Sequence, residues 1–228
     1  MRWDAFELFD LGILYLRILS FIDLGVKDIA IQELRPGCTW SSSCEGLRVS
    51  LPDPKSLKFL DLGSKVDKDT TNVKSGSNGD GATVEFKSGL VAIARENQKA
   101  FDGLALFENC FFTSNPTVTF PVLFLSQAKF RQLTVDNGKI SRTKLGNAQV
   151  KGIVNSMVEV ADDVVNLTNY GDDTEVYVVA EAFTNRFEPV NQAIDELNCL
   201  TDYYCVVRGD KFSEAMGPVF SGFFLNKS

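Results

Sequence analysis

Hydrophobic residues recur every three or four positions between Asn147 and Asn169, which is the spacing of one face of an α-helix. The apolar positions are Val150, Ile153, Val154, Met157, Val158, Ala161, Val164, Val165 and Leu167. After the turn Tyr170–Asp173, the segment Val176–Ala180 contains β-branched, aromatic and small residues and no charge. This composition is typical of a strand that is covered on both sides. The pattern therefore predicts a helix and a buried strand that form the spine of one core.

The segment from Trp3 to Leu24 is also predicted to be helical, although Gly12 costs about 1 kcal/mol relative to alanine inside a helix. One face carries Trp3, Phe6, Phe9, Ile13 and Leu16, and the opposite face carries Leu8, Leu11, Tyr15 and Ile18. A helix that is apolar nearly all round must be covered on most sides, by its own domain or by another subunit. Burial in the chain's own core is the simpler interpretation. The alternative is an interface arm with contact residues Trp3, Phe6, Phe9, Ile13 and Leu16.

Short strands and a polar loop follow this helix. Val26–Leu34 and Leu47–Leu51 alternate enough to form strands, and Pro52 ends the second one. Residues 65–82 are rich in Gly, Ser, Asp, Lys and Asn, and are predicted to form a flexible loop. Its carboxylates are expected to be solvated, because the glycine and terminal glutamate of a calcium-binding loop are absent.

The remainder of the chain alternates between strand and helix patterns. Predicted strands are Thr83–Phe86, Val118–Ser126, Phe130–Val135, Tyr203–Val207 and Val219–Leu225, and predicted helices run from Ser88 to Phe101 or Leu106 and from Glu188 to Leu200. Pro121 cannot donate a ladder hydrogen bond, which indicates either an edge position for its strand or an interruption within it. Asn137-Gly138 predicts a tight hairpin turn.

This order of elements predicts an α+β fold, with a mixed α/β arrangement as the alternative. We expect one mixed sheet with flanking helices, preceded by an N-terminal helical arm and the flexible loop. The corresponding domain division is 1–64 for the helical arm and short strands, 65–82 for the loop, and 83–228 for the main domain.

Composition restricts the chemistry that this chain of 228 residues can perform. It contains 23 basic and 30 acidic residues, for a net charge of -7, which argues against direct binding to nucleic-acid phosphates. It contains no histidine, so it lacks the usual general base, the commonest metal ligand and the base of standard Ser or Cys nucleophile systems. Nucleotide-binding glycine loops and closely spaced cysteine pairs are also absent from the sequence. We therefore expect no catalytic residues and no cofactor.

Localisation is predicted from the most hydrophobic segment and from the cysteines. Leu8–Val26 is interrupted by Asp10, Arg17 and Asp23, so neither a membrane span nor a signal peptide is expected. We expect the protein to be cytoplasmic or assembled into a particle such as a virion. The five cysteines are expected to be mainly buried thiols, and neighbouring phenylalanines should raise the pKa of the Cys110 thiol.

Tyr170-Gly171-Asp172-Asp173 is the one segment with the form of a catalytic signature. Paired carboxylates on a tight turn can bind Mg²⁺, as in the Gly-Asp-Asp turn of RNA-dependent polymerases. Here the preceding element is a predicted helix, and a helix end followed by a glycine turn explains the residues. Asp172 and Asp173 therefore remain metal ligands only in an alternative hypothesis.

Two functional hypotheses follow. In the first, the chain is a non-enzymatic structural or assembly subunit of a larger oligomeric complex, such as a virus or phage particle component. Its partners would be copies of itself and other assembly subunits, contacted through the N-terminal helix. In the second, it is a carboxylate-based, divalent-metal-dependent enzyme or ligand-binding domain that uses Asp172 and Asp173.

Overall fold

The structure is a computed structural model of the chain. It describes the backbone of residues 3–36, 40, 42–130, 134–136, 139–141, 147–170, 174, 176–186, 200–208 and 219–222. It describes side chains over residues 7–36, 40, 42–127, 156–157, 159–170, 174 and 176–180.

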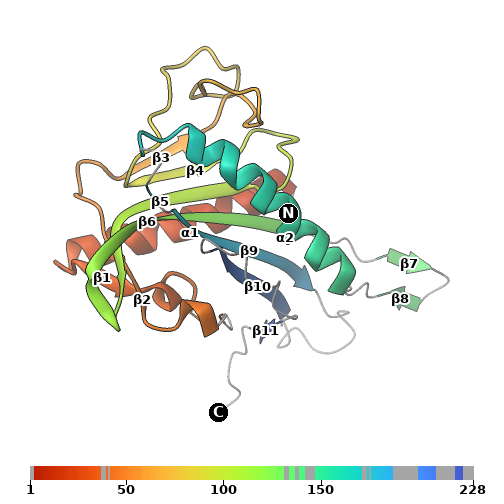
Figure 1. Ribbon diagram of the computed structural model, residues 1–228. Coiled ribbons are helices and arrows are strands. Elements are labelled where there is room, and N and C mark those ends of the chain that lie inside the picture. Colours follow the sequence, from red (N-terminus) through yellow and green to blue (C-terminus); the bar gives the residue numbers. More distant parts are fainter. Residues whose placement is uncertain are drawn as a thin grey trace.

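Nine strands of the described chain form one mixed sheet, as expected for an α+β fold (Figure 1). The main path runs β1-β2-β5-β6-β9-β10-β11, and β4 joins β5 at one edge and β3 at the other. The bounds are β1 Asp28–Ala30, β2 Leu47–Ser50, β3 Lys58–Asp61, β4 Leu90–Ile93, β5 Gly103–Phe112, β6 Asn115–Phe130, β9 Tyr177–Arg186, β10 Leu200–Arg208 and β11 Val219–Gly222. Pairing is parallel between β3 and β4 and between β6 and β9, and antiparallel elsewhere in this sheet.

One long helix covers each face of the sheet. α1 (Trp3–Asp23) lies behind β5 and β6 in Figure 1, and α2 (Asn147–Asn166) lies in front of the sheet. Side chains of the central strands alternate between the two layers, as strand geometry requires. On β9, for example, Val178 and Ala180 join the cluster on the α2 side, whereas Val179 joins the cluster on the α1 side. The central helix and the doubly covered strand predicted from the sequence are confirmed.

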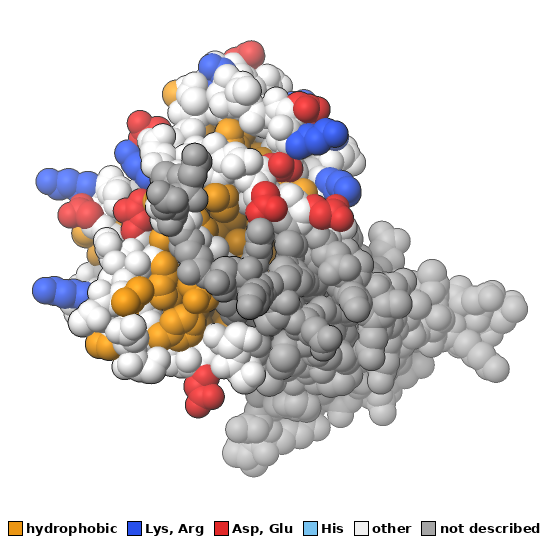
Figure 2. Space-filling model, viewed as in Figure 1, with side chains coloured by type: hydrophobic (Ala, Val, Ile, Leu, Met, Phe, Trp, Pro, Cys, Tyr) orange, Lys and Arg blue, Asp and Glu red, His pale blue; other side chains and the backbone are white. Residues whose placement is uncertain are grey.

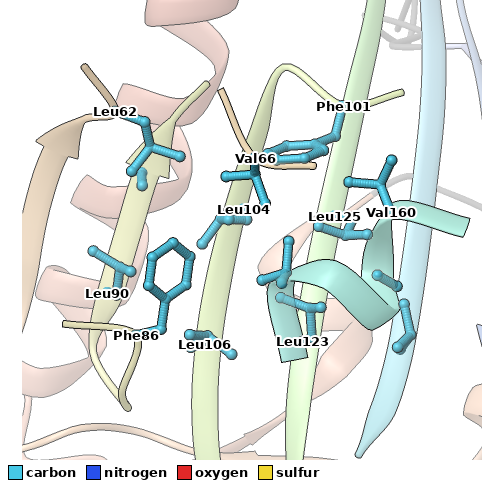
Figure 3. Close-up of a cluster of buried hydrophobic side chains, with 14 of the residues drawn as sticks. Leu62, Val66, Phe86, Leu90, Phe101, Leu104, Leu106, Leu123, Leu125 and Val160 are labelled. Carbon is cyan, nitrogen blue, oxygen red and sulfur yellow. The ribbon is translucent and has the colours of Figure 1, made fainter. Parts of the chain in front are cut away.

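The cluster on the α2 side brings together buried residues of β4, β5, β6, β9, α2 and the polar loop (Figure 3). Leu104 and Leu106 of β5 and Leu123 and Leu125 of β6 are fully buried in it. Loop residues Val66 and Val73 are 2% and 0% exposed in the same cluster. The Gln98 side chain also accepts a hydrogen bond from the Val66 N–H at 2.9 Å and donates one to the Val66 carbonyl at 2.8 Å. The polar loop is therefore anchored to the core at both of its valines.

The cluster on the α1 side determines which face of α1 is buried. Leu11, Leu14 and Ile18 are 2%, 0% and 0% exposed and pack against β4, β5 and β6. Leu11 lies directly over Gly103 at the start of β5, where an added Cβ atom would overlap Leu11 Cδ1. Glycine at position 103 therefore lets α1 lie close against the sheet.

Gly103→Ala is expected to lower the free energy of unfolding by about 1–3 kcal/mol, because the new methyl group overlaps Leu11 and α1 must shift. Urea unfolding measures this change. Gly12→Ala is the matched control in α1, where an added Cβ meets nothing within 4 Å. Helix propensity predicts that this control raises stability by up to about 1 kcal/mol. Equal effects of the two substitutions would contradict this packing of α1.

One prediction for the middle of the chain is wrong. The helix predicted from Ser88 is instead strand β4, the turn before Gly103 and strand β5. Positive φ angles of 62° at Asn97 and 80° at Ala100 reverse the chain between these strands. The apolar run Leu90–Ile93 is too short for its periodicity to distinguish a buried strand from a buried helix. Its pairing with β3 and β5 makes it a strand.

Pro121 lies in a central strand, where it marks an interruption and not an edge, so the second of the two predicted alternatives is confirmed. β6 is hydrogen-bonded to β5 on one side and to β9 on the other. On the β5 side, Phe107 pairs with Val122 and Cys110 pairs with Phe120, so two residues of β5 lie opposite Pro121 alone. On the β9 side, the parallel pairing begins only at Val122. Proline is tolerated because it coincides with this bulge, where a ladder hydrogen bond is interrupted.

The remaining sequence predictions have mixed outcomes. The N-terminal helix, the strand at Leu47 and the hairpin formed by β7 (Thr134–Asp136) and β8 (Lys139–Ser141) are confirmed. The strand predicted over Val26–Leu34 is limited to β1, because Ile31–Leu34 forms the 3-10 helix η1. A second 3-10 helix, η2, spans Ser42–Cys44. Thr83–Phe86 forms isolated bridges and no strand. The helix predicted at 188–200 lies almost wholly outside the described residues. The three-part domain division stays a prediction.

Candidate interaction surface

The outward face of α1 carries most of the large hydrophobic side chains that the described structure leaves exposed. Phe9 and Leu16 are each 58% exposed, Leu8 is 51% exposed and Ile13 is 40% exposed. Leu24, directly after the helix, is 78% exposed, and the only other such residue among the described side chains is Val118. Exposed apolar residues that gather on one element mark an interaction surface, whereas scattered ones do not.

Helix geometry places three of these residues in one line. With about 100° between successive residues, Phe9, Ile13 and Leu16 lie on one side of α1, opposite the buried Leu11 and Ile18. We call Phe9, Ile13 and Leu16 the outer stripe. These are three of the five interface residues predicted from the sequence. The side chains of the other two, Trp3 and Phe6, lie outside the described residues.

A buried ion pair fixes α1 to the rest of the domain. Arg35, just after η1, donates from Nη1 to Asp10 Oδ1 at 2.9 Å and from Nη2 to Asp10 Oδ2 at 2.6 Å. The Arg35 and Asp10 side chains are 6% and 13% exposed. Burial raises the pKa of the Asp10 carboxyl above its ordinary value, and the adjacent Arg35 guanidinium opposes that rise. The outer stripe is therefore displayed on a helix that is held in place by packing and by a bidentate pair.

The carboxylates of the metal hypothesis, Asp172 and Asp173, lie outside the described residues, so that hypothesis stays a prediction. Among the side chains that are described, no group of three or more acidic or cysteine residues could hold a metal ion. Asp163 of α2 is the nearest approach to an acidic cluster: slight burial and then the charges of Asp162, Asp67 and Asp69 raise its pKa. Acidic and basic side chains are interspersed over this part of the molecule in Figure 2, as on an ordinary solvated surface.

Cys110 and Tyr170 are the other ionisable groups with strong shifts. Cys110, in β5, is fully buried, and burial raises the pKa of its thiol to about 12. The Tyr170 hydroxyl donates a hydrogen bond to Glu108 Oε1 at 3.1 Å, and burial followed by the Glu108 charge raises the pKa of this phenol. The thiolate is the reactive form of cysteine, so Cys110 is unsuited to nucleophilic catalysis. The predicted burial of Cys110 is confirmed.

The Cys110 thiol makes stability depend on alkaline pH. The unfolded thiol loses its proton near its ordinary pKa of 9.0, whereas the folded thiol keeps it until about pH 12. Unfolding in this window releases a proton, so stability falls as pH rises, by about 1.4 kcal/mol per unit. We expect Cys110→Ala to remove this part of the slope in urea unfolding measured from neutral pH to about pH 10.5. Identical slopes in the two proteins would contradict the burial of this thiol.

No protein-family model matches this chain, and it matches neither a curated protein nor a solved structure. None of the helices in the described part of the chain is both long and apolar enough to cross a membrane. A functional proposal therefore rests on the geometry of the chain itself.

Proposed function

We propose that this chain is a non-enzymatic subunit of a larger oligomeric assembly, and that copies associate through the outer stripe of α1. The observation that carries the proposal is the concentration of exposed large hydrophobic side chains on this one helix. Exposure of neighbouring apolar side chains to water is unfavourable in free energy, and association of two copies removes this exposure. A component of a virus or phage particle is one kind of assembly that would use such a subunit.

The size of the stripe indicates how strong this contact can be. Full burial of a Phe, Leu or Ile side chain contributes about 1.5–3 kcal/mol, and the outer stripe and Leu8 are each roughly half exposed, so burying all four contributes about 3–6 kcal/mol from each of the two copies. Association itself costs several kcal/mol in lost translational and rotational freedom. The contact is therefore expected to be concentration-dependent when it acts alone, and to be strengthened when many copies associate at once.

The N-terminal helix is best tested by surface substitutions and not by deletion. Leu11, Leu14 and Ile18 contribute to the core on the α1 side, so removing the helix would expose the sheet that it covers. A change of oligomeric state in such a truncated protein would not distinguish a lost interface from a lost fold. Substitution of the outward-facing residues leaves these core contacts in place.

Hydroxyl-radical footprinting of the full-length protein tests this proposal. Phe9 and Leu16 should be labelled strongly in dilute protein and protected several-fold at high concentration, because association covers them. Val118 is the matched control, since it is 54% exposed and lies in β6 and not in α1. Its labelling should stay constant. Equal labelling of Phe9 at all concentrations would count against an interface on α1.

A further inference from the structure

We draw no further inference here: the strongest candidate, the half-buried aromatic patch of Phe112, Phe120 and Tyr177 where β5, β6 and β9 lie side by side, carries nothing because no described residue shows what would cover it.

Discussion

Ile13→Asp is expected to convert the associated protein into a monomer without unfolding it. Ile13 is at the centre of the outer stripe and 40% exposed, so an aspartate at this position is hydrated in the monomer. Association would have to remove that water and bury a charge against apolar side chains. We expect association to weaken about 100-fold or more, which corresponds to about 2.8 kcal/mol. Sedimentation velocity over a range of protein concentrations measures the change.

Two controls define what this result means. Val118→Asp introduces the same charge at an exposed apolar residue outside α1, and should leave the sedimentation profile unchanged. Leu14→Asp places the charge on the buried face of the same helix, and should unfold the protein. An Ile13→Asp variant that keeps the wild-type mass distribution would exclude the outer stripe as the contact.

Arg35→Met is expected to lower the free energy of unfolding by about 3–5 kcal/mol. It leaves the Asp10 carboxylate buried at 13% exposure without the bidentate partner that holds both of its oxygens. The double variant Asp10→Leu, Arg35→Met should recover most of this loss, because it contains no buried charge at the site. Urea unfolding of the two variants and the wild type measures both effects.

The pH dependence of the Arg35→Met variant provides an independent check. Burial already raises the pKa of Asp10, and loss of the guanidinium raises it further. A carboxyl with a raised folded-state pKa binds its proton more readily when folded, so acidification through that pKa stabilises the variant relative to wild type. Arg48→Met is the matched control, since the Arg48–Asp28 pair has side chains 33% exposed and should cost less than about 1 kcal/mol. Equal losses at Arg35 and Arg48 would contradict a buried pair that holds α1 in place.

Sequence periodicity predicted the elements whose environment is uniform along their length. α2 packs one face against the sheet, and Met157, Ala161 and Val164 of the predicted face are buried. The Val178–Ala180 part of β9 is covered on both faces, which accounts for its lack of charge. The pairing of Asp136 with Lys139 agrees with the hairpin that the intervening Asn-Gly sequence predicts locally. In each case a short stretch of sequence contains the physical information that decides the structure.

The features that sequence did not predict depend on contacts between distant residues. Pro121 indicated an edge or an interruption, and the bulge in β5 opposite it decides between the two. The Asp10–Arg35 pair joins residues 25 positions apart. The sequence showed that α1 is apolar nearly all round, and its buried face is identified only by the packing of Leu11, Leu14 and Ile18 against the sheet. Only then could Phe9, Ile13 and Leu16 be identified as the exposed side.

The central claim is that the outer stripe of α1 makes this chain associate with copies of itself. The most direct test is the solution mass of the purified full-length protein, measured by light scattering over a wide concentration range. We predict a mass that rises with concentration from that of one chain toward a defined multiple of it. A mass of one chain at every concentration, including the highest, would contradict the account.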